Sequence, residues 1–205
     1  MTIIPSIIAK DQKELNSRLK KLKGISKMLH LDIMDGDFVK NKSLWFDFKV
    51  PKGNYEAHLM TTRPEMFIGR HHDKIKRFIV HVETTQNLDD TIKFVHSMKK
   101  EIVIAINPTT DMEIDCDETR RYLKKIDGVL VMTVNPGTYG AKFIPKMLDR
   151  VKELRKMNKK IPIEVDGSMN PNTIALAKKA GATRFSVGSY LQKAKNVKKA
   201  YSELQ

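Results

Sequence analysis

The sequence predicts an α/β protein built as a single-domain (β/α)8 TIM barrel over residues 1–205. Short apolar segments of strand length recur along the whole chain, and amphipathic segments of helical length separate most of them. Such alternation is typical of a parallel sheet covered by helices. Because there are eight strand segments, a closed barrel is favoured over an open sheet.

The eight expected strands are rich in β-branched and other apolar residues. They are TIIPSII from residue 2, MLHLDI from 28, YEAHLM from 55, RFIVHVE from 77, EIVIAIN from 101, GVLVMTV from 128, IPIEVDG from 161 and RFSVGSY from 184. Helices are expected over 12–23, 87–99, 143–158 and 171–180. Asn170-Pro171 predicts the start of the last helix, and Gly181 its C-terminal cap. Segment 39–54 leaves room only for a short or irregular element.

Composition favours a cytoplasmic protein with no membrane partner. The one cysteine, Cys116, cannot form an internal disulfide, and the N-terminal stretch lacks a signal-peptide pattern. No apolar run approaches the roughly 18 residues that a membrane-spanning helix needs.

The charge balance is strongly basic. Lysine and arginine outnumber the acids 38 to 24, for a formal net charge of +14, which suits nucleic acid or a small anion. The lysine pairs are scattered near predicted helices and are not interleaved with aromatic residues. We therefore interpret them as solvated helix faces and expect no nucleic-acid partner.

Ionisable side chains stand near the ends of three predicted strands, where barrels of this kind carry their chemistry. Residues two apart on a strand point to the same face. The sets that share a face are His30, Asp32 and Met34, then His58 and Met60, and then Glu164 and Asp166. If these faces look inward, the histidines and carboxylates converge at the mouth of the barrel.

Two histidines and two carboxylates would suit one divalent cation. We expect zinc, with iron, manganese or cobalt as alternatives, since these ligand types accept several ions. Burying an unpaired polar group costs roughly 2 to 7 kcal/mol. His30 and Asp32 on one buried face therefore need compensation, which a metal would supply.

Six stretches, in order and at predicted strand ends, resemble the ribulose-phosphate 3-epimerase family. They are PSIIAKD, HLDIMDGDFV, HLM, VMTVNPGTYGAKFIP, EVDGSMNP and VGSYL. The resemblance implies a barrel of the ribulose-phosphate-binding type that interconverts ketose phosphates differing at carbon 3. It implies a divalent metal held by His30, Asp32, His58 and Asp166, with Asp32 and Asp166 as acid and base on opposite faces of the substrate. The sequence leaves open whether the chain forms a homo-oligomer.

Two carboxyl groups suffice for this chemistry. Inverting a stereocentre beside a ketone requires removal of the proton from one face and return of a proton to the other. The intermediate is an enediolate, and a divalent metal would stabilise its charge as a Lewis acid.

The resemblance also implies substrate contacts at Ser6 and His58, and a thioether layer from Met34, Met60 and Met132 around the reacting carbons. Without the resemblance, Ser6 is an ordinary strand-end residue, and most of the 11 methionines fill gaps in the core.

Phosphate recognition is expected from the late loops, where backbone amides and helix N-termini bind phosphate in many barrels. Gly167-Ser168 follow the seventh strand, Gly188-Ser189 lie within the eighth, and the segment from Gly137 to Gly140 closes from the sixth loop. We interpret nearby Lys142 as solvated.

The chain departs from the family in the loops that would contact the phosphate. It has PGTYGAKF where the family reads PGFGGQKF, so Tyr139 replaces a glycine and Ala141 a glutamine; Ser168 also stands where a second glycine is usual. EVDGSMN and HLMTTRP resemble the allulose-6-phosphate 3-epimerase branch. We expect D-ribulose 5-phosphate as substrate, with D-allulose 6-phosphate as the alternative.

The alternative functions are a related phosphate-binding barrel enzyme, a basic RNA-associating barrel and a catalytically silent barrel. Related decarboxylases and hexulose-phosphate synthases show an Asp-x-Lys-x-x-Asp pattern, whereas this chain has DIMDGD. A basic RNA-associating barrel without catalysis would explain the net charge. A silent barrel would leave the four metal-type ligands without a joint purpose.

The remaining histidines and acids lie outside the predicted ligand set. We expect His71, His72 and His96 to lie at the surface, and we leave the role of His81 with Glu83 open. Glu164 would orient Asp166 or a metal-bound histidine from behind, or would face outward if its strand is bulged.

Overall fold

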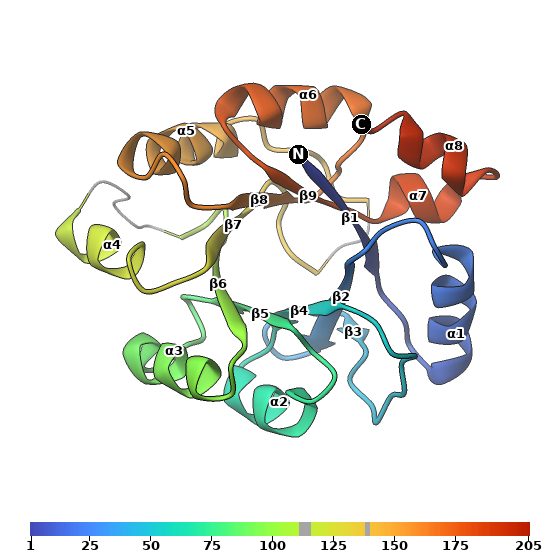
Figure 1. Ribbon diagram of the computed structural model, residues 1–205, viewed down its shortest axis with the longest axis horizontal. Helices are drawn as coiled ribbons and strands as arrows, with labels where there is room; N and C mark the ends of the chain where they lie inside the picture. The colour runs from blue at the N-terminus through green and yellow to red at the C-terminus, as the bar shows by residue number, and fades with distance from the viewer. Residues whose placement is uncertain (111–115, 138–139) are drawn as a thin grey trace.

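Eight parallel strands form a closed barrel in the computed structural model, which describes residues 1–110, 116–137 and 140–205 (Figure 1). Hydrogen bonding runs in the order β1-β9-β8-β7-β6-β5-β4-β2, and β1 pairs with β2 to close the ring. The predicted (β/α)8 barrel is confirmed. The strands are β1 (Thr2–Ile7), β2 (Leu29–Asp35), β4 (Tyr55–Met60), β5 (Arg77–His81), β6 (Glu101–Ile106), β7 (Gly128–Met132), β8 (Ile163–Asp166) and β9 (Arg184–Val187).

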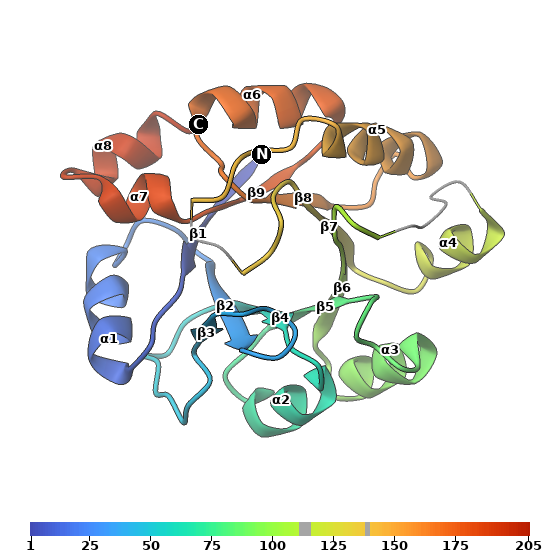
Figure 2. The ribbon, with the colours of Figure 1, turned by 180° about the vertical axis from the view of Figure 1, so that it is seen from behind.

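Helices surround the barrel on its outside, as Figures 1 and 2 show from opposite sides. They are α1 (Gln12–Lys21), α2 (Pro64–His71), α3 (Leu88–Ser97), α4 (Asp117–Tyr122), α5 (Met147–Met157), α6 (Pro171–Ala180), α7 (Ser189–Lys193) and α8 (Val197–Ser202). The four predicted helical segments correspond to α1, α3, α5 and α6. Among the described residues, no helix is long and apolar enough to cross a membrane.

Segment 36–54 replaces the helix that would follow β2. It contains the short strand β3 (Lys42–Ser43), which pairs antiparallel with β2, and all of its residues are described without a helix among them. The expectation of a short or irregular element is confirmed. Fully buried Phe48 from this segment packs against Phe67 of α2, so side chains of the irregular segment cover the barrel here.

One histidine on α2 was wrongly expected at the surface. His71 is only 8% exposed, because the rings of Phe48 and Phe67 lie 5.0 and 4.4 Å from its ring. Its burial depends on a residue more than twenty positions earlier in an irregular segment, which periodicity along α2 could not indicate. His72 and His96 are exposed, as predicted.

The interior of the barrel is divided chemically. A buried apolar cluster around Ile79, Val103, Leu130 and Met132 comes mainly from β5, β6 and β7. Buried ionisable residues come mainly from β2, β4, β5 and β8, and include His30, His58, His81 and Glu164. The outer faces of the strands pack on the helices in one large apolar core.

Candidate metal centre and active site

The four predicted ligands meet inside the barrel. Asp32 on β2 pairs in register with His58 on the adjacent β4, and Asp166 reaches the same point from β8. His58 Nδ1 lies 3.3 Å from Asp32 Oδ1 and 3.5 Å from Asp166 Oδ2, and His30 Nε2 lies 3.2 Å from Asp32 Oδ1. One possible ligand atom from each residue lies within 4.8 Å of all the others.

Charge interactions within this group outweigh the cost of burial. Burial lowers the pKa of His30, but the carboxylates of Asp32, Glu164 and Glu56 reverse the effect and hold that pKa well above its usual value. Burial raises the pKa of Asp32, whereas His30 and His58 bring it below its ordinary value. The site therefore favours carboxylate anions around a positive charge.

The donor set fits a divalent cation. His58 Nδ1 is buried and makes no hydrogen bond, although it faces two carboxylates. A buried nitrogen without a partner is costly, and a cation between two imidazoles and two carboxylates would supply the missing partner. The site can hold a metal, and its ligand types do not select one metal.

A second set of ligand-type groups, His30, Glu56 and Glu164, also comes together. It suits a cation less well, because Glu56 already accepts a hydrogen bond from Arg77 Nη1 at 2.6 Å and has no exposed surface. These groups instead support His30 from behind. Glu56 lies 2.8 Å from His30 Nδ1, which directs Nε2 toward Asp32.

The support for His30 continues away from the centre. Arg77 also bonds to Glu101, at 2.7 Å, so three charged residues on adjacent strands hold one another. Neither Glu56 nor Arg77 was predicted as part of the site, although Glu56 shares a strand face with His58 in YEAHLM. That shared face was the available signal for Glu56.

Glu164 faces inward, so the outward-facing alternative is wrong. It is 1% exposed, and its Oε1 lies 3.5 Å from His30 Nδ1. Neither of its carboxylate oxygens makes a hydrogen bond. Burial and the carboxylate of Glu56 raise the pKa of Glu164 to about 7. Glu164 thus lies next to His30, one of the proposed metal ligands, where it could orient the His30 ring.

His81 and Glu83 lie behind His58. His81 has no exposed surface, and its Nε2 is 2.8 Å from His58 Nε2. Its Nδ1 is 3.2 Å from Glu83 Oε2. Burial lowers the pKa of His81 to about 4, which favours a neutral imidazole.

A cavity of about 210 Å³ opens over the carboxylates of Asp32 and Asp166. His30 and His58 lie beneath it and do not line it, so the structure brings no direct support to a substrate contact by His58. The predicted substrate residues that do line the cavity are Ser6, Met34, Met60, Met132, Gly137, Gly140, Gly167, Ser168, Gly188 and Ser189.

The cavity wall differs in part from the expected one. Gly188 and Ser189 were expected within the eighth strand, but β9 ends at Val187 and Ser189 begins α7. The observed strand β9 is therefore shorter than the expected segment RFSVGSY. Lys142 is not among the lining residues, and Tyr139 falls outside the described part of the chain.

One part of the cavity wall was not predicted from the sequence. It is formed by Asn41, Lys42 and Ser43 around β3. The side-chain amide of Asn41 donates a hydrogen bond to the backbone carbonyl of Gly137, and this bond joins the segment to the loop after β7. Gly137 has φ +84°, and a Cβ there would meet the side chain of Val39. The irregular segment gave no periodic pattern from which these contacts could be predicted.

The loop after β8 is bonded to the loop after β7. The Thr133 amide donates to the carbonyl of Asp166 at 2.8 Å, and the Ser168 hydroxyl donates to the carbonyl of Ala141. Gly167 has φ +115° and leaves no room for a Cβ beside Val134. These contacts fix the backbone next to Asp166 at the floor of the cavity.

Fold and site together define a class, a (β/α)8-barrel enzyme with paired carboxylates under a small cavity. A model of the ribulose-phosphate 3-epimerase family matches residues 2–192. Ribulose-phosphate 3-epimerases from Schizosaccharomyces pombe and Bacillus subtilis are 31% and 32% identical to the chain; each match covers 99% of this chain, with 92% and 97% of those proteins. The chain belongs to the ribulose-phosphate 3-epimerase family and is an isomerase of the epimerase type.

Solved structures with other activities share the fold. The 3-hexulose-6-phosphate synthase of Salmonella typhimurium matches with a TM-score of 0.69 at 15% identity, covering 100% of this chain and 96% of that one. Orotidine 5'-monophosphate decarboxylase of Sulfolobus solfataricus matches with a TM-score of 0.64 at 15% identity, covering 98% and 94%. At such identities the likeness concerns the barrel alone.

Proposed function

We propose that the protein interconverts D-ribulose 5-phosphate and D-xylulose 5-phosphate by proton transfer at carbon 3. The observation that carries the proposal is the placement of Asp32 and Asp166 on separate strands, at the floor of one cavity and with His58 between them. Family membership and the names of the relatives support the pentulose substrate.

The two aspartates divide the chemistry between opposite faces of the substrate. One carboxylate removes the proton from carbon 3, and the other carboxyl group returns a proton from the opposite side. Reversal of the reaction exchanges these roles. Met34, Met60 and Met132 line the cavity next to them, and their thioethers exclude water from the reacting carbons.

A divalent cation belongs to this proposal. His30, Asp32, His58 and Asp166 would hold it, and when bound it supplies Lewis-acid stabilisation for the negative charge of the enediolate. Zinc is the first expectation, with iron, manganese or cobalt as alternatives.

We assign the phosphate group to the part of the cavity wall that follows β8 and β9. Gly167, Ser168, Gly188 and Ser189 line the cavity there and are partly buried. Ser168 has φ +53° and Gly167 φ +115°, so consecutive residues with positive φ follow β8. Backbone amides in such turns suit an anion.

The first experiment measures turnover of D-ribulose 5-phosphate and D-allulose 6-phosphate by purified protein with added zinc, manganese or cobalt. We expect turnover of the pentulose phosphate with the higher kcat/KM. Preference for the hexulose phosphate would assign the alternative substrate, and turnover of neither would refute the epimerase proposal.

Substitution of either aspartate tests the mechanism. Asp32→Asn and Asp166→Asn should each lower kcat by about 10²-fold or more, since each removes one of two required proton-transfer groups. Asp73→Asn makes the same change at an exposed position and should retain activity. Metal content is measured in parallel, because both aspartates are proposed ligands. Full inversion activity in either site variant would contradict the two-carboxylate mechanism.

A further inference from the structure

Each proposed histidine ligand has polar groups behind it, but the two arrangements differ. His30 lies directly against the carboxylate of Glu56, at 2.8 Å. His58 has another imidazole behind it, with 2.8 Å between His58 Nε2 and His81 Nε2. The two rings are nearly parallel, with an interplanar angle of 20°. The carboxylate in this second arrangement, Glu83, is one residue further away.

The hydrogen bonds that join Glu83, His81 and His58 can run in only one direction when both imidazoles are neutral. A carboxylate only accepts, so His81 donates its Nδ1–H to Glu83 Oε2 at 3.2 Å. A neutral imidazole with a proton on Nδ1 has a lone pair on Nε2. His81 Nε2 therefore accepts a hydrogen bond from His58 Nε2–H. His58 Nδ1 is left with its lone pair.

The free lone pair points to the candidate metal centre. His58 Nδ1 lies 3.3 Å from Asp32 Oδ1 and 3.5 Å from Asp166 Oδ2, and it is buried without a hydrogen bond. The opposite tautomer would place a proton on this nitrogen and prevent it from binding a cation.

Glu83 is itself held in place. Its Oε1 accepts a hydrogen bond from the backbone amide of Asn107 at 3.1 Å and another from the Thr110 hydroxyl. Both donors follow β6, the next strand of the barrel. Burial raises the pKa of Glu83, but the hydrogen bonds from His81 and Thr110 outweigh it and lower the pKa to about 2. Glu83 is thus an oriented, ionised acceptor.

We propose that His81 and Glu83 are positioning residues that fix His58 in the Nε2-protonated tautomer, so that Nδ1 is available to a divalent cation. The inference deepens the proposed function, because it concerns the metal centre on which that function rests. We call the hydrogen-bonded chain of Glu83, His81 and His58 the relay. Through it, the loops after β5 and β6 fix the orientation of the His58 ring beneath the cavity.

The relay is tested first without any substitution. In zinc-loaded protein labelled with ¹⁵N histidine, long-range ¹H–¹⁵N spectra report which ring nitrogens carry protons. We expect His58 protonated at Nε2 and bound to zinc through Nδ1, and His81 protonated at Nδ1 alone. Binding of zinc through His58 Nε2, or a proton on His81 Nε2, would overturn the proposal.

Variants then test the direction of the relay through the affinity of metal-free protein for Zn²⁺, measured by competition with a chelator. His81→Phe keeps a ring of similar shape but cannot accept, and we expect affinity about 10- to 100-fold weaker. Glu83→Lys places a donor where His81 needs an acceptor and should weaken binding more than Glu83→Gln. Glu153→Lys makes the same charge change at a partly exposed position on α5, where Glu153 pairs only with Arg150 at the surface, and should leave affinity unchanged.

The outcomes separate the relay from a structural role and from the substrate. Equal Zn²⁺ affinity in His81→Phe, Glu83→Lys and the unaltered protein refutes the relay. Weaker affinity that only follows a lower melting temperature assigns a structural role and also refutes it. Since neither experiment uses a sugar phosphate, a confirmed relay in a protein that turns over no ketose phosphate would reject the proposed function alone.

Discussion

Asp35 holds together two loops beside the candidate metal centre, although it is neither a proposed ligand nor part of the cavity wall. Its Oδ1 accepts from the amides of Asp37 and Phe38, both at 2.9 Å, and its Oδ2 accepts from the amide of Thr62 at 2.7 Å. The carboxylate therefore joins the loop after β2 to the loop after β4, and those strands carry the metal-type ligands. Asp35 lies three positions after Asp32 on β2, so its side chain leaves the strand on the opposite face from that ligand.

Asp35→Asn should destabilise the protein in a pH-dependent way. Burial raises the pKa of Asp35, but the amides of Thr62, Phe38 and Asp37 outweigh it and lower the pKa below its usual value. A lowered pKa in the folded state contributes stability above the unfolded value of about 4, which is lost as the pH falls through the folded value. We expect Asp35→Asn to cost about 1–3 kcal/mol at pH 7 and progressively less below about pH 4.

Urea unfolding of metal-free protein at several pH values measures this difference. Asp37→Asn is the matched control, because Asp37 is exposed and should lose little stability at any pH. A cost for Asp35→Asn that stays constant from pH 7 to pH 3 would show that the ionised carboxylate is not the stabilising species.

At the scale of elements, the start of α6 fixes the loop that follows Asp166. The Asn170 side chain accepts from the amides of Asn172 and Thr173, and the Thr173 hydroxyl accepts from the Asn170 amide. This capping box satisfies amides that the first turn leaves unpaired. It therefore anchors the chain between Asp166 and the helix.

Asn170→Ala should lower the free energy of unfolding by about 0.5–2 kcal/mol, the usual cost of losing an N-terminal cap. Because Gly167 and Ser168 precede the cap, we also expect a higher KM for the sugar phosphate with a smaller change in kcat. Asn172→Ala is the control, since the Asn172 side chain is exposed and does not cap the helix. Equal losses in the two variants would contradict the role of the cap.

The sequence predicted the elements better than the contacts between them. Apolar segments of strand length and the Asn170 and Gly181 signals gave the barrel and the limits of α6, because both are local in the chain. The burial of Arg77 was missed because its compensating partners, Glu56 and Glu101, lie on the two neighbouring strands. The wall around Lys42 was missed for the same reason, since Gly137 and Met34 lie on other elements.

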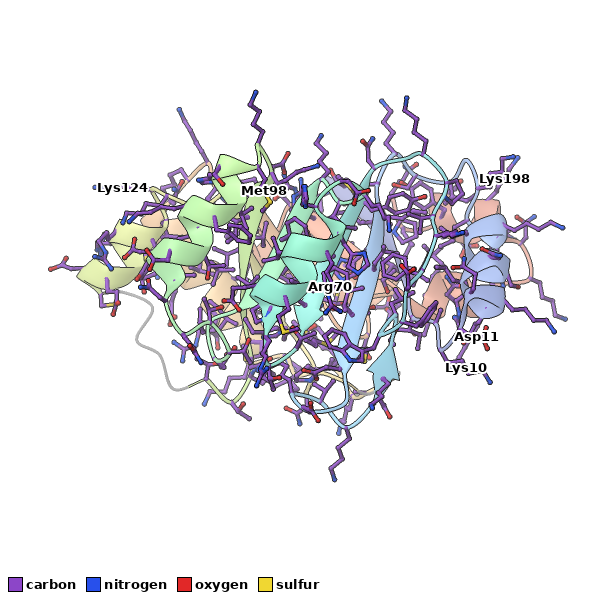
Figure 3. The ribbon with its side chains drawn as sticks, turned by 90° about the horizontal axis from the view of Figure 1, so that it is seen from below. Lys10, Asp11, Arg70, Met98, Lys124 and Lys198 are labelled. Carbon is purple, nitrogen blue, oxygen red and sulfur yellow. The ribbon has the colours of Figure 1, made fainter. Side chains whose placement is uncertain are left out.

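At the scale of the whole molecule, charge is spread over the outside of the barrel. Figure 3 shows long basic side chains projecting from several helices, with Lys124 and Lys198 near opposite sides of the view. Both residues are exposed. Solvated lysines such as these contribute to the net charge of +14, and they act on a distant anion through their long-range field.

This field should assist a dianionic substrate at low salt. The Debye length falls from about 30 Å at 0.01 M to about 8 Å at 0.15 M ionic strength, so distant lysines stop contributing as salt is added. We expect kcat/KM for the sugar phosphate to fall several-fold over this range while kcat changes little. Kinetics in sodium chloride at a fixed metal concentration measure the effect.

A double variant, Lys124→Gln with Lys198→Gln, removes one charge from the turn after α4 and one from α8. It should show a shallower salt dependence of kcat/KM with unaltered kcat.

Generic single-stranded RNA serves as a competing anion. If the surface were built for RNA, RNA would bind at 0.15 M salt and its affinity would fall steeply with further salt. We expect RNA binding to be weak there because basic residues are dispersed around the barrel. Tight RNA binding at 0.15 M salt, together with no salt dependence of kcat/KM, would instead assign the excess charge to an RNA surface.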